Sequence, residues 1–287
     1  MIAIIKKEMH NYFNHVSGYA FLFFYTVLSA IIFINTNVRQ QNAGYFHTLI
    51  NSTMIFMLMV PLLTMRLFSE EYTQKTDQLL YTAPITTASI VFGKFFAACL
   101  MLFIGVAITF VFPILISPYG QLPINQIIGT YVGFYLMGVA FISIGVFVSV
   151  STHSQVVAAL GSFALIFVFF MMMDLMNLIP TTRDAGVIFA GGVSALIGYI
   201  FYSSTKNVWA SGGLLAVLAS MIGIAYVLTP SFFDGLAIRS LQWVSIVSRF
   251  GGFSFGVLVV ADMVYYITFA ALFCFFAITV IEKRRWA

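Results

Sequence analysis

The chain of 287 residues is 61% apolar and only 8% charged, and its mean hydropathy is +1.03. Soluble domains carry charge on about a quarter of their residues, so this composition excludes a soluble domain and predicts a polytopic helical membrane protein. The formal net charge of +4 does not indicate nucleic-acid binding, because most basic residues stand at the ends of apolar runs rather than on one face of a domain.

Residues 1–17 precede the first membrane-length apolar run. Ile4, Ile5 and Tyr12 recur at helical spacing beside Lys6 and Lys7, which predicts an amphipathic helix lying in the membrane interface. The alternative is a solvated extension of the first span. No small-residue cleavage site follows, so we expect no removable signal peptide.

A helix needs about 20 mostly apolar residues to cross the bilayer core. The sequence predicts an all-α transmembrane domain over residues 18–287 with eight spans, and six as the fallback. The weakest boundary separates the fifth and sixth spans, where only Arg183 and Asp184 after Pro180 interrupt the apolar run. The eight apolar windows lie near residues 18–36, 47–66, 91–116, 127–150, 155–178, 185–203, 208–228 and 258–281.

The distribution of basic residues predicts the orientation of the chain. With an even number of spans and a cytoplasmic N-terminus, nine of the thirteen Lys and Arg residues face the cytoplasm, as the positive-inside rule favours. Both termini are therefore expected to be cytoplasmic. The nine are Lys6, Lys7, Arg66, Lys75, Lys94, Lys206, Lys283, Arg284 and Arg285, and the four others are Arg39, Arg183, Arg239 and Arg249.

The loop between the second and third spans is the most polar stretch of the chain. We predict a cytoplasmic helix from about Ser69 to Tyr81, with Ser69 as its N-cap and with Glu70 and Glu71 in the first turn, where their charges complement the helix dipole. The chain must turn at Pro84 before the next span. The alternative is a solvated loop without a partner.

Other polar residues form no recognisable site. Cys99 and Cys274 lie within apolar runs and lack the spacing of a disulfide framework or thiolate site, and the four histidines are scattered. The sequence thus predicts neither metal ligands nor catalytic residues. Asp174 and Asp262 lie near outer span boundaries, which predicts solvated or capped carboxylates rather than a proton relay.

Residues 230–256 are too interrupted to span the membrane. Asp234, Arg239, Arg249 and a pair of glycines break the apolar run, and Trp243 is a suitable interfacial anchor. This pattern predicts short helices at the outer leaflet. They would form either a packed surface loop or a lid over an exit.

Three stretches resemble a known family. The loop at 66–94 resembles the one after the second span in permease subunits of the ABC-2 transporter family, usually Glu-Arg-Arg-x-Gly-Thr-x-Glu-Leu-Leu-x-Thr-x-Pro-Val followed by Gly-Lys. Residues 3–21 and 245–286 are similar to the two ends of the gliding-motility-associated branch. The loop matches at Glu71, Thr76, Leu79, Leu80, Thr82, Pro84, Ile85, Gly93 and Lys94, and it departs at Tyr72, Thr73, Lys75 and Gln78.

This resemblance implies a bundle of type V-like ABC-2 architecture in a bacterial cytoplasmic membrane. The chain would be the permease of an exporter that moves an amphipathic or lipid-like substrate. Residues 69–85 would form a coupling helix that docks on a separate cytoplasmic ATPase. The residues implied for coupling are Glu70, Glu71, Thr76, Leu79, Leu80 and Pro84.

The sequence lacks the G-x-x-x-x-G-K-[ST] phosphate loop. The chain is therefore not expected to be an enzyme or to hold a cofactor, and ATP and Mg²⁺ would bind to the partner ATPase. A second permease or accessory membrane subunit of different sequence is favoured, with a homodimer as the open alternative. An ion-coupled secondary transporter remains a second interpretation, although inverted repeats and charged midplane sites are not evident.

The predicted orientation can be tested with an impermeant thiol reagent on intact cells. Cysteines introduced at Ala3 and Ala287 are expected to resist labelling, because both ends would face the cytoplasm. Labelling at either position would contradict this topology.

Overall fold

The computed structural model describes residues 1–42, 44–76, 85–120 and 123–286. Within these ranges all regular secondary structure is helical and no β-strand occurs. Seven helices are long and apolar enough to cross a membrane, and a bent helix pair makes an eighth. They coincide with the eight predicted windows, which confirms the all-α fold and agrees with the upper span count.

The chain divides into two compact units, Met1–Phe169 with Arg249–Ala287, and Phe170–Ser248. The first unit contains most of the helices, and α10 (Gln155–Leu178) runs from the first unit into the second. The elements of the first unit are α1 (Ile2–Asn14), α2 (Val16–Phe33), the π-helix η1 (Ile34–Val38), α3 (Phe46–Ser52), α4 (Ile55–Thr64), α5 (Ser69–Gln74), α7 (Thr87–Thr109), α8 (Val111–Ile116), the 3₁₀ turn η2 (Ser117–Tyr119), α9 (Ile124–Ser151), α14 (Phe250–Ser254) and α15 (Val260–Trp286).

The second span is broken between α3 and α4. The two helices meet at an angle of 57°, and polar residues mark the break. The Ser52 hydroxyl donates to the Thr48 carbonyl at 2.7 Å and the Thr53 hydroxyl donates to the Ile50 carbonyl at 2.8 Å. Hydroxyls that bond back to the preceding turn bend helices, so the local sequence accounts for the break.

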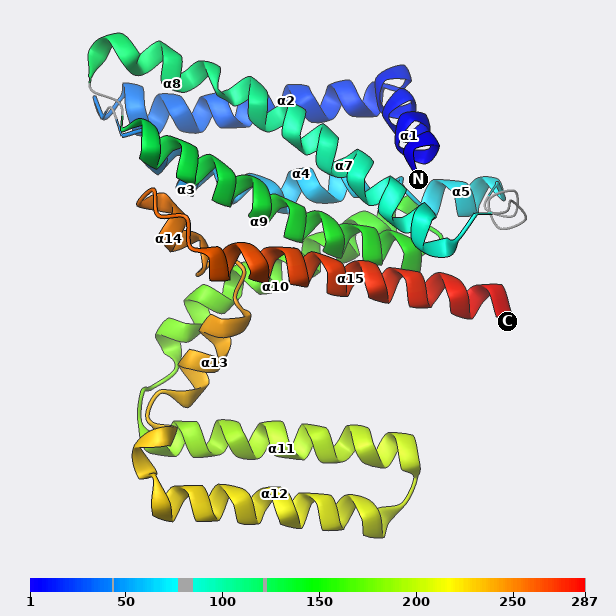
Figure 1. Cartoon of the computed structure of the whole chain (residues 1–287), viewed down its shortest axis with the longest axis vertical. Coiled ribbons are helices and arrows are strands. Elements are labelled where there is room, and N and C mark those ends of the chain that lie inside the picture. Colours follow the sequence, from blue (N-terminus) through cyan, green and yellow to red (C-terminus); the bar gives the residue numbers. More distant parts are fainter. Residues whose placement is uncertain (43, 77–84, 121–122, 287) are drawn as a thin grey trace. The chain divides into compact units, whose positions relative to one another are not determined.

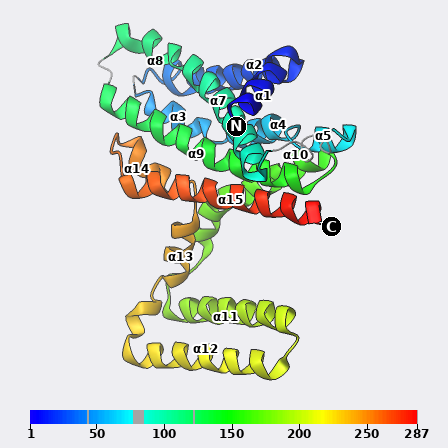
Figure 2. The same ribbon diagram turned by 45° about the vertical axis from the view of Figure 1, so that its right-hand side comes forward.

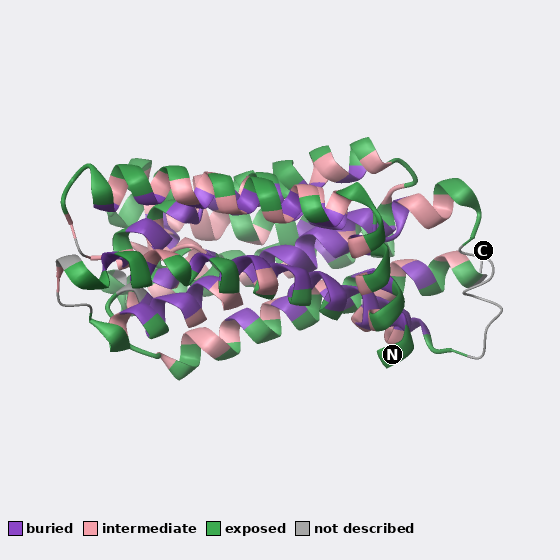
Figure 3. Ribbon diagram, turned by 90° about the horizontal axis from the view of Figure 1, so that it is seen from above, coloured by how far each residue is buried: buried purple, intermediate pink, exposed green. Residues whose placement is uncertain are grey.

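Helix α9 forms the centre of the first unit. It packs against α4, α7 and α15 (Figures 1 and 2), and 72% of its most apolar window is buried. Figure 3 shows buried positions along the facing sides of these helices and exposed ones on their outer sides. At Gly145 an added Cβ would overlap the Thr64 side chain of α4, so a residue without a side chain is needed for this close helix contact.

Both termini lie at the same end of the first unit. A Cβ built at Gly93 of α7 would lie 3.5 Å from the Met1 carbonyl oxygen, and the Thr87 hydroxyl at the start of α7 donates to Glu282 near the C-terminus at 3.0 Å. An even number of crossings requires this arrangement. That this end faces the cytoplasm stays a prediction.

The second unit is a helical hairpin with two short helices. Its elements are α11 (Arg183–Thr205), α12 (Val208–Leu228), the 3₁₀ turn η3 (Pro230–Phe233) and α13 (Leu236–Val244). The predicted boundary between the fifth and sixth spans is confirmed, because α10 ends at Leu178 and α11 begins at Arg183. Only 11% of the α11 window and 6% of the α12 window are buried, so most apolar side chains of this hairpin face outward.

Residues 230–256 form η3, α13 and α14. Short helices are thus present in the segment where the sequence predicts them. Their position at the outer leaflet, and a role as a lid, stay predictions.

The close contact at Gly145 can be tested by adding a side chain. Gly145→Leu is expected to destabilise the protein by about 1–3 kcal/mol, since α4 and α9 must separate to admit it. Thermal unfolding in detergent measures the effect. Gly223→Leu on α12 is the matched control, because no atom lies within 4 Å of a Cβ built there, and equal losses for both variants would contradict the packing argument.

Candidate functional site

Helix α5 lies at the end of the first unit where both termini meet. It continues from α4 through the turn Met65–Phe68, and the Ser69 hydroxyl donates back to the Met65 carbonyl. The prediction of Ser69 as N-cap is therefore wrong. Phe68 is the N-cap residue, and Ser69 is the first residue of the helix itself. The predicted helix to Tyr81 is also interrupted, since α5 ends at Gln74, and residues 77–81 of the predicted range lie outside the described residues.

Lys75 ends α5 in the left-handed conformation, with φ of 57° and ψ of 24°. Helices commonly end at such a residue, and glycine adopts it without steric cost. Lys75 occupies the position where the ABC-2 loop pattern has its glycine. A left-handed turn thus forms here on a lysine, and the Thr76 amide closes it by donating to the Glu71 carbonyl at 3.0 Å.

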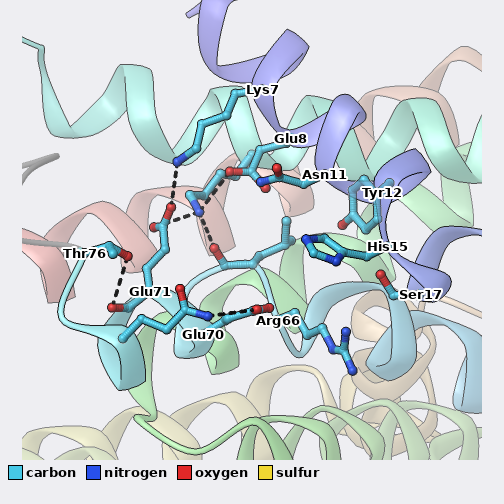
Figure 4. Close-up of a pocket in the computed structure, with 13 residues that line it drawn as sticks. Lys7, Glu8, Asn11, Tyr12, His15, Ser17, Arg66, Glu70, Glu71 and Thr76 are labelled. Carbon is cyan, nitrogen blue, oxygen red and sulfur yellow. Dashed lines mark hydrogen bonds and ion pairs between the residues drawn. The ribbon is translucent and has the colours of Figure 1, made fainter.

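The ammonium of Lys94 is the centre of a buried charge cluster beside α5. Its side chain is 1% exposed, and Nζ lies 2.8 Å from Glu71 Oε2 and 3.2 Å from Glu8 Oε1. It also donates to the Leu67 carbonyl. Lys7 adds a second cation 3.2 Å from Glu71 Oε1. We call these four side chains, Lys94, Glu8, Glu71 and Lys7, the lysine cluster (Figure 4).

Helix α1 presents Glu8 to this cluster from its buried face. Ile4, Glu8 and Tyr12 follow one another at four-residue spacing and are all buried. A Cβ at Gly93 of α7 would lie 2.8 Å from Ile4 Cγ2, so glycine permits α1 to lie directly against α7. The lysine cluster therefore joins three helices, α1, α5 and α7.

Tyr12 fixes the same helix to α4. Its hydroxyl donates to the Leu63 carbonyl at 2.9 Å. Burial raises the pKa of the Tyr12 phenol well above its ordinary value, and the nearby Glu8 carboxylate raises it further. The hydroxyl thus stays protonated and remains a hydrogen-bond donor throughout the physiological pH range.

The opposite side of α5 contacts the α9–α10 turn and the end of α15. Thr73 donates to the His153 carbonyl at 2.9 Å, and the Tyr72 ring lies 5.2 Å from the His153 ring in an edge arrangement. Arg284 of α15 stacks on Tyr72 at 4.8 Å and donates to the Ser151 carbonyl at 3.0 Å. A cation over an aromatic face is attracted by the ring quadrupole. Tyr72 and Thr73, which replace the basic pair of the family pattern, therefore hold α5 to the α9–α10 turn and to α15.

A cleft of about 660 Å³ lies between α1 and α5. Lys7, Glu8, Glu71 and Thr76 line one part of it, and Figure 4 shows Arg66, His15 and Ser17 toward the other. No cluster of His, Cys, Asp and Glu that could hold a metal ion occurs among the described residues. The cleft can bind polar and charged groups, and its side chains carry no arrangement typical of a catalytic centre.

The structure brings together part of the predicted coupling set. Glu70, Glu71 and Thr76 line the cleft with Tyr12 and Lys7 from the predicted interface helix. Ile4 is buried, Ile5 is half-buried and Lys6 is exposed. Leu79, Leu80 and Pro84 lie outside the described residues. The role of each in coupling stays a prediction.

Sequence reasoning missed Lys94 and Glu8 as partners. Lys94 was assigned to the cytoplasmic side, although it falls inside the predicted third span, where a charge requires a partner. The four-residue spacing of Ile4, Glu8 and Tyr12 was the corresponding signal on α1. Asp262 was likewise expected to be capped or solvated, but it pairs with Arg249 at 2.8 Å.

Comparison with known families identifies the chain. The sequence model of the ABC-2 family transporter protein matches residues 3–191, about two thirds of the chain. The protein belongs to the ABC-2 transporter family. The match contains α1, α5, α7 and α9, and thus the whole lysine cluster. It ends within α11, so α12 and the following helices lie beyond it.

As an ABC-2 family member with seven to eight span-capable helices, this protein is the multi-pass membrane component of an ABC transporter. The prediction of a permease is confirmed at this level, and membership of the family disfavours the secondary-transporter interpretation. In the family such a membrane subunit generally pairs with a cytoplasmic ATPase subunit. A comparison with curated proteins gave no match for the chain.

The lysine cluster can be tested by removing its central cation. Lys94→Met is expected to destabilise the packing of α1 and α5 on α7 by about 3–5 kcal/mol, because it leaves two largely buried carboxylates facing each other. Hydrogen–deuterium exchange should then increase in α1, residues 2–14.

Two further variants test whether loss of the buried cation causes the increased exchange in α1. Lys6→Met removes an exposed lysine of the same helix and is expected to leave exchange unchanged. The triple variant Lys94→Met, Glu8→Leu and Glu71→Leu should recover most of the protection, because an apolar replacement of a buried ionic cluster is often neutral. Unchanged exchange in Lys94→Met would contradict a structural role for the cluster.

Proposed function

We propose that this ABC-2 protein is the permease of an ATP-driven exporter and that α5, with the segment after it up to Pro84, is the docking site for a separate ATPase. ATP and Mg²⁺ would bind to that ATPase. The exporter moves an amphipathic or lipid-like substrate out of the cytoplasm or the inner leaflet of a bacterial cytoplasmic membrane. Both termini and α5 face the cytoplasm.

One observation carries this proposal. The six-residue helix α5 has side-chain contacts on two sides, to Lys94 of α7 and Lys7 of α1 through Glu71, and to the α9–α10 turn and α15 through Tyr72 and Thr73. A solvated loop without a function would not require such a set of contacts. A displacement of α5 would therefore act directly on four parts of the bundle, namely α1, α7, the α9–α10 turn and α15.

The turn before α5 adds a route to the core. The Phe68 amide donates to Ser149 Oγ of α9 at 3.1 Å, and the Phe68 ring lies 4.8 Å from the Lys94 ammonium. Since α9 is the central helix of the first unit, a push on α5 reaches the most buried helix directly. Packed interiors transmit such displacements because they are close-packed and poorly compressible.

The similarity of both ends of the chain to the gliding-motility-associated branch supports an assembly with a different membrane subunit. The outward-facing apolar surface of α11 and α12 is compatible with such a partner and equally with lipid. A homodimer is the alternative. Purification of the complex from its native host in mild detergent, followed by mass spectrometry, distinguishes these assemblies.

The docking proposal is tested by the double variant Leu79→Asp and Leu80→Asp. It is expected to abolish co-purification of the ATPase, because two charges would replace apolar side chains at the docking surface, while membrane insertion continues.

The matched control is Thr205→Asp with Lys206→Asp in the α11–α12 turn, which is predicted to face the same side of the membrane. This control should retain the ATPase. Full recovery of the ATPase with the Leu79 and Leu80 variant would refute the docking site, and absence of any phosphate-loop ATPase from the native complex would refute the proposed function itself.

A further inference from the structure

The cleft between α1 and α5 contains two charges that no other described residue pairs. Six charged side chains of the described residues line it, three cations and three carboxylates, so this lining is formally neutral. Four of them form the lysine cluster. The two others, Arg66 and Glu70, have no ion-pair partner among the described residues, although Glu70 accepts one hydrogen bond from Gln74 at 3.2 Å.

The buried wall of the cleft has unused hydrogen-bonding capacity. Glu8 is only 6% exposed, and its Oε1 accepts no hydrogen bond from the described residues although it lies 3.2 Å from Lys94 Nζ. Buried carboxylate oxygens are normally satisfied by donors, and each exception requires an explanation. This oxygen is covered by protein atoms, so Glu8 adds negative charge to the wall of the cleft without an exposed acceptor there.

The opposite part of the cleft contains donors for an anion. His15 and Ser17, like Arg66, line the cleft and have no side-chain hydrogen bond to any residue that the structure describes, and no described side chain caps the start of α2 at Val16. The first amides of a helix favour a negative group. The cleft thus presents an anion-binding part and a cation-binding part without an excess of either charge.

The surroundings of the cleft contain large exposed apolar side chains. Val16 and Tyr19 at the start of the first span are 80% and 58% exposed, and Ile2 on α1 is 79% exposed. In a membrane protein these side chains contact lipid at the level where a span enters the bilayer. A ligand of the cleft can therefore combine a polar part inside it with acyl chains outside.

From this arrangement we propose that the cleft binds the headgroup of a phosphatidylethanolamine molecule in the adjacent leaflet. The phosphate lies near Arg66, His15 and the start of α2. The primary ammonium donates to the Glu70 carboxylate, which lines the cleft. A volume of about 660 Å³ is sufficient, since small-molecule sites typically measure about 300–1,000 Å³.

The chemistry separates this ligand from other common lipids. Phosphatidylglycerol has the phosphate but no ammonium, and would bring an anion to Glu70 without compensation. Phosphatidylcholine has a cation without N–H groups, so it cannot donate hydrogen bonds to a carboxylate. The site would also hold α1 at the membrane surface, and it does not depend on the docking of an ATPase.

The test uses native mass spectrometry of the full chain without ATPase. The delipidated protein is titrated with phosphatidylethanolamine, phosphatidylcholine and phosphatidylglycerol of identical acyl chains. We expect at least about tenfold preferential retention of phosphatidylethanolamine, of the order given by one charge-assisted hydrogen bond. Glu70→Gln should remove this preference, whereas Arg66→Gln should lower the retention of all three lipids, because each of them carries the phosphate.

One control variant and two competing ligands complete the lipid-binding test. Arg39→Gln alters an exposed arginine at the other end of the first span and should retain the preference. Equal retention of the three lipids, an unchanged preference in Glu70→Gln, or unchanged retention in Arg66→Gln would overturn the proposal. Full displacement by millimolar phosphoethanolamine would overturn the lipid assignment in favour of a soluble zwitterion. Displacement by the ATPase would assign the cleft to that partner.

Discussion

A buried ammonium needs negative partners, and this requirement organises the end of the bundle where α5 lies. Lys94 comes from the third span, yet the carboxylates that surround it come from α1 and α5. Removing Lys94 would leave two largely buried carboxylates without their shared cation, which is much more unfavourable than losing an exposed ion pair. Three helices that are separate in sequence are therefore constrained to stay together.

The same helix α5 is held by chemically different contacts on its two sides. Charges join Glu71 to α1 and α7, whereas a hydrogen bond and ring contacts join Thr73 and Tyr72 to His153 and Arg284. Charge contacts tolerate small changes in distance, and the hydrogen bond and stacked contacts depend on orientation. Together they define both the position and the rotation of α5. The proposed docking of an ATPase on α5 would need such a fixed geometry.

The sequence predicts the span pattern well because membrane crossing depends on length and local apolarity. Even the boundary at Arg183 follows from the residues on either side of it. The cap at Ser69 and the burial of Lys94 depend instead on tertiary contacts. Ser69 is not a cap because the chain arrives as a continuing helical turn, and Lys94 is buried because Glu8 and Glu71 reach it from distant elements. The left-handed Lys75 could be anticipated only by comparison with a family pattern that has glycine there.

The lysine cluster also has a consequence for the order of biogenesis. Glu8 leaves the ribosome first, Glu71 follows after the second span, and Lys94 comes last, at the start of the third. Until Lys94 is present, the two carboxylates lack the buried cation that they share. Helix α1 can therefore complete its contacts only after the start of the third span has been made, so it reaches its final place later than its position in the sequence suggests.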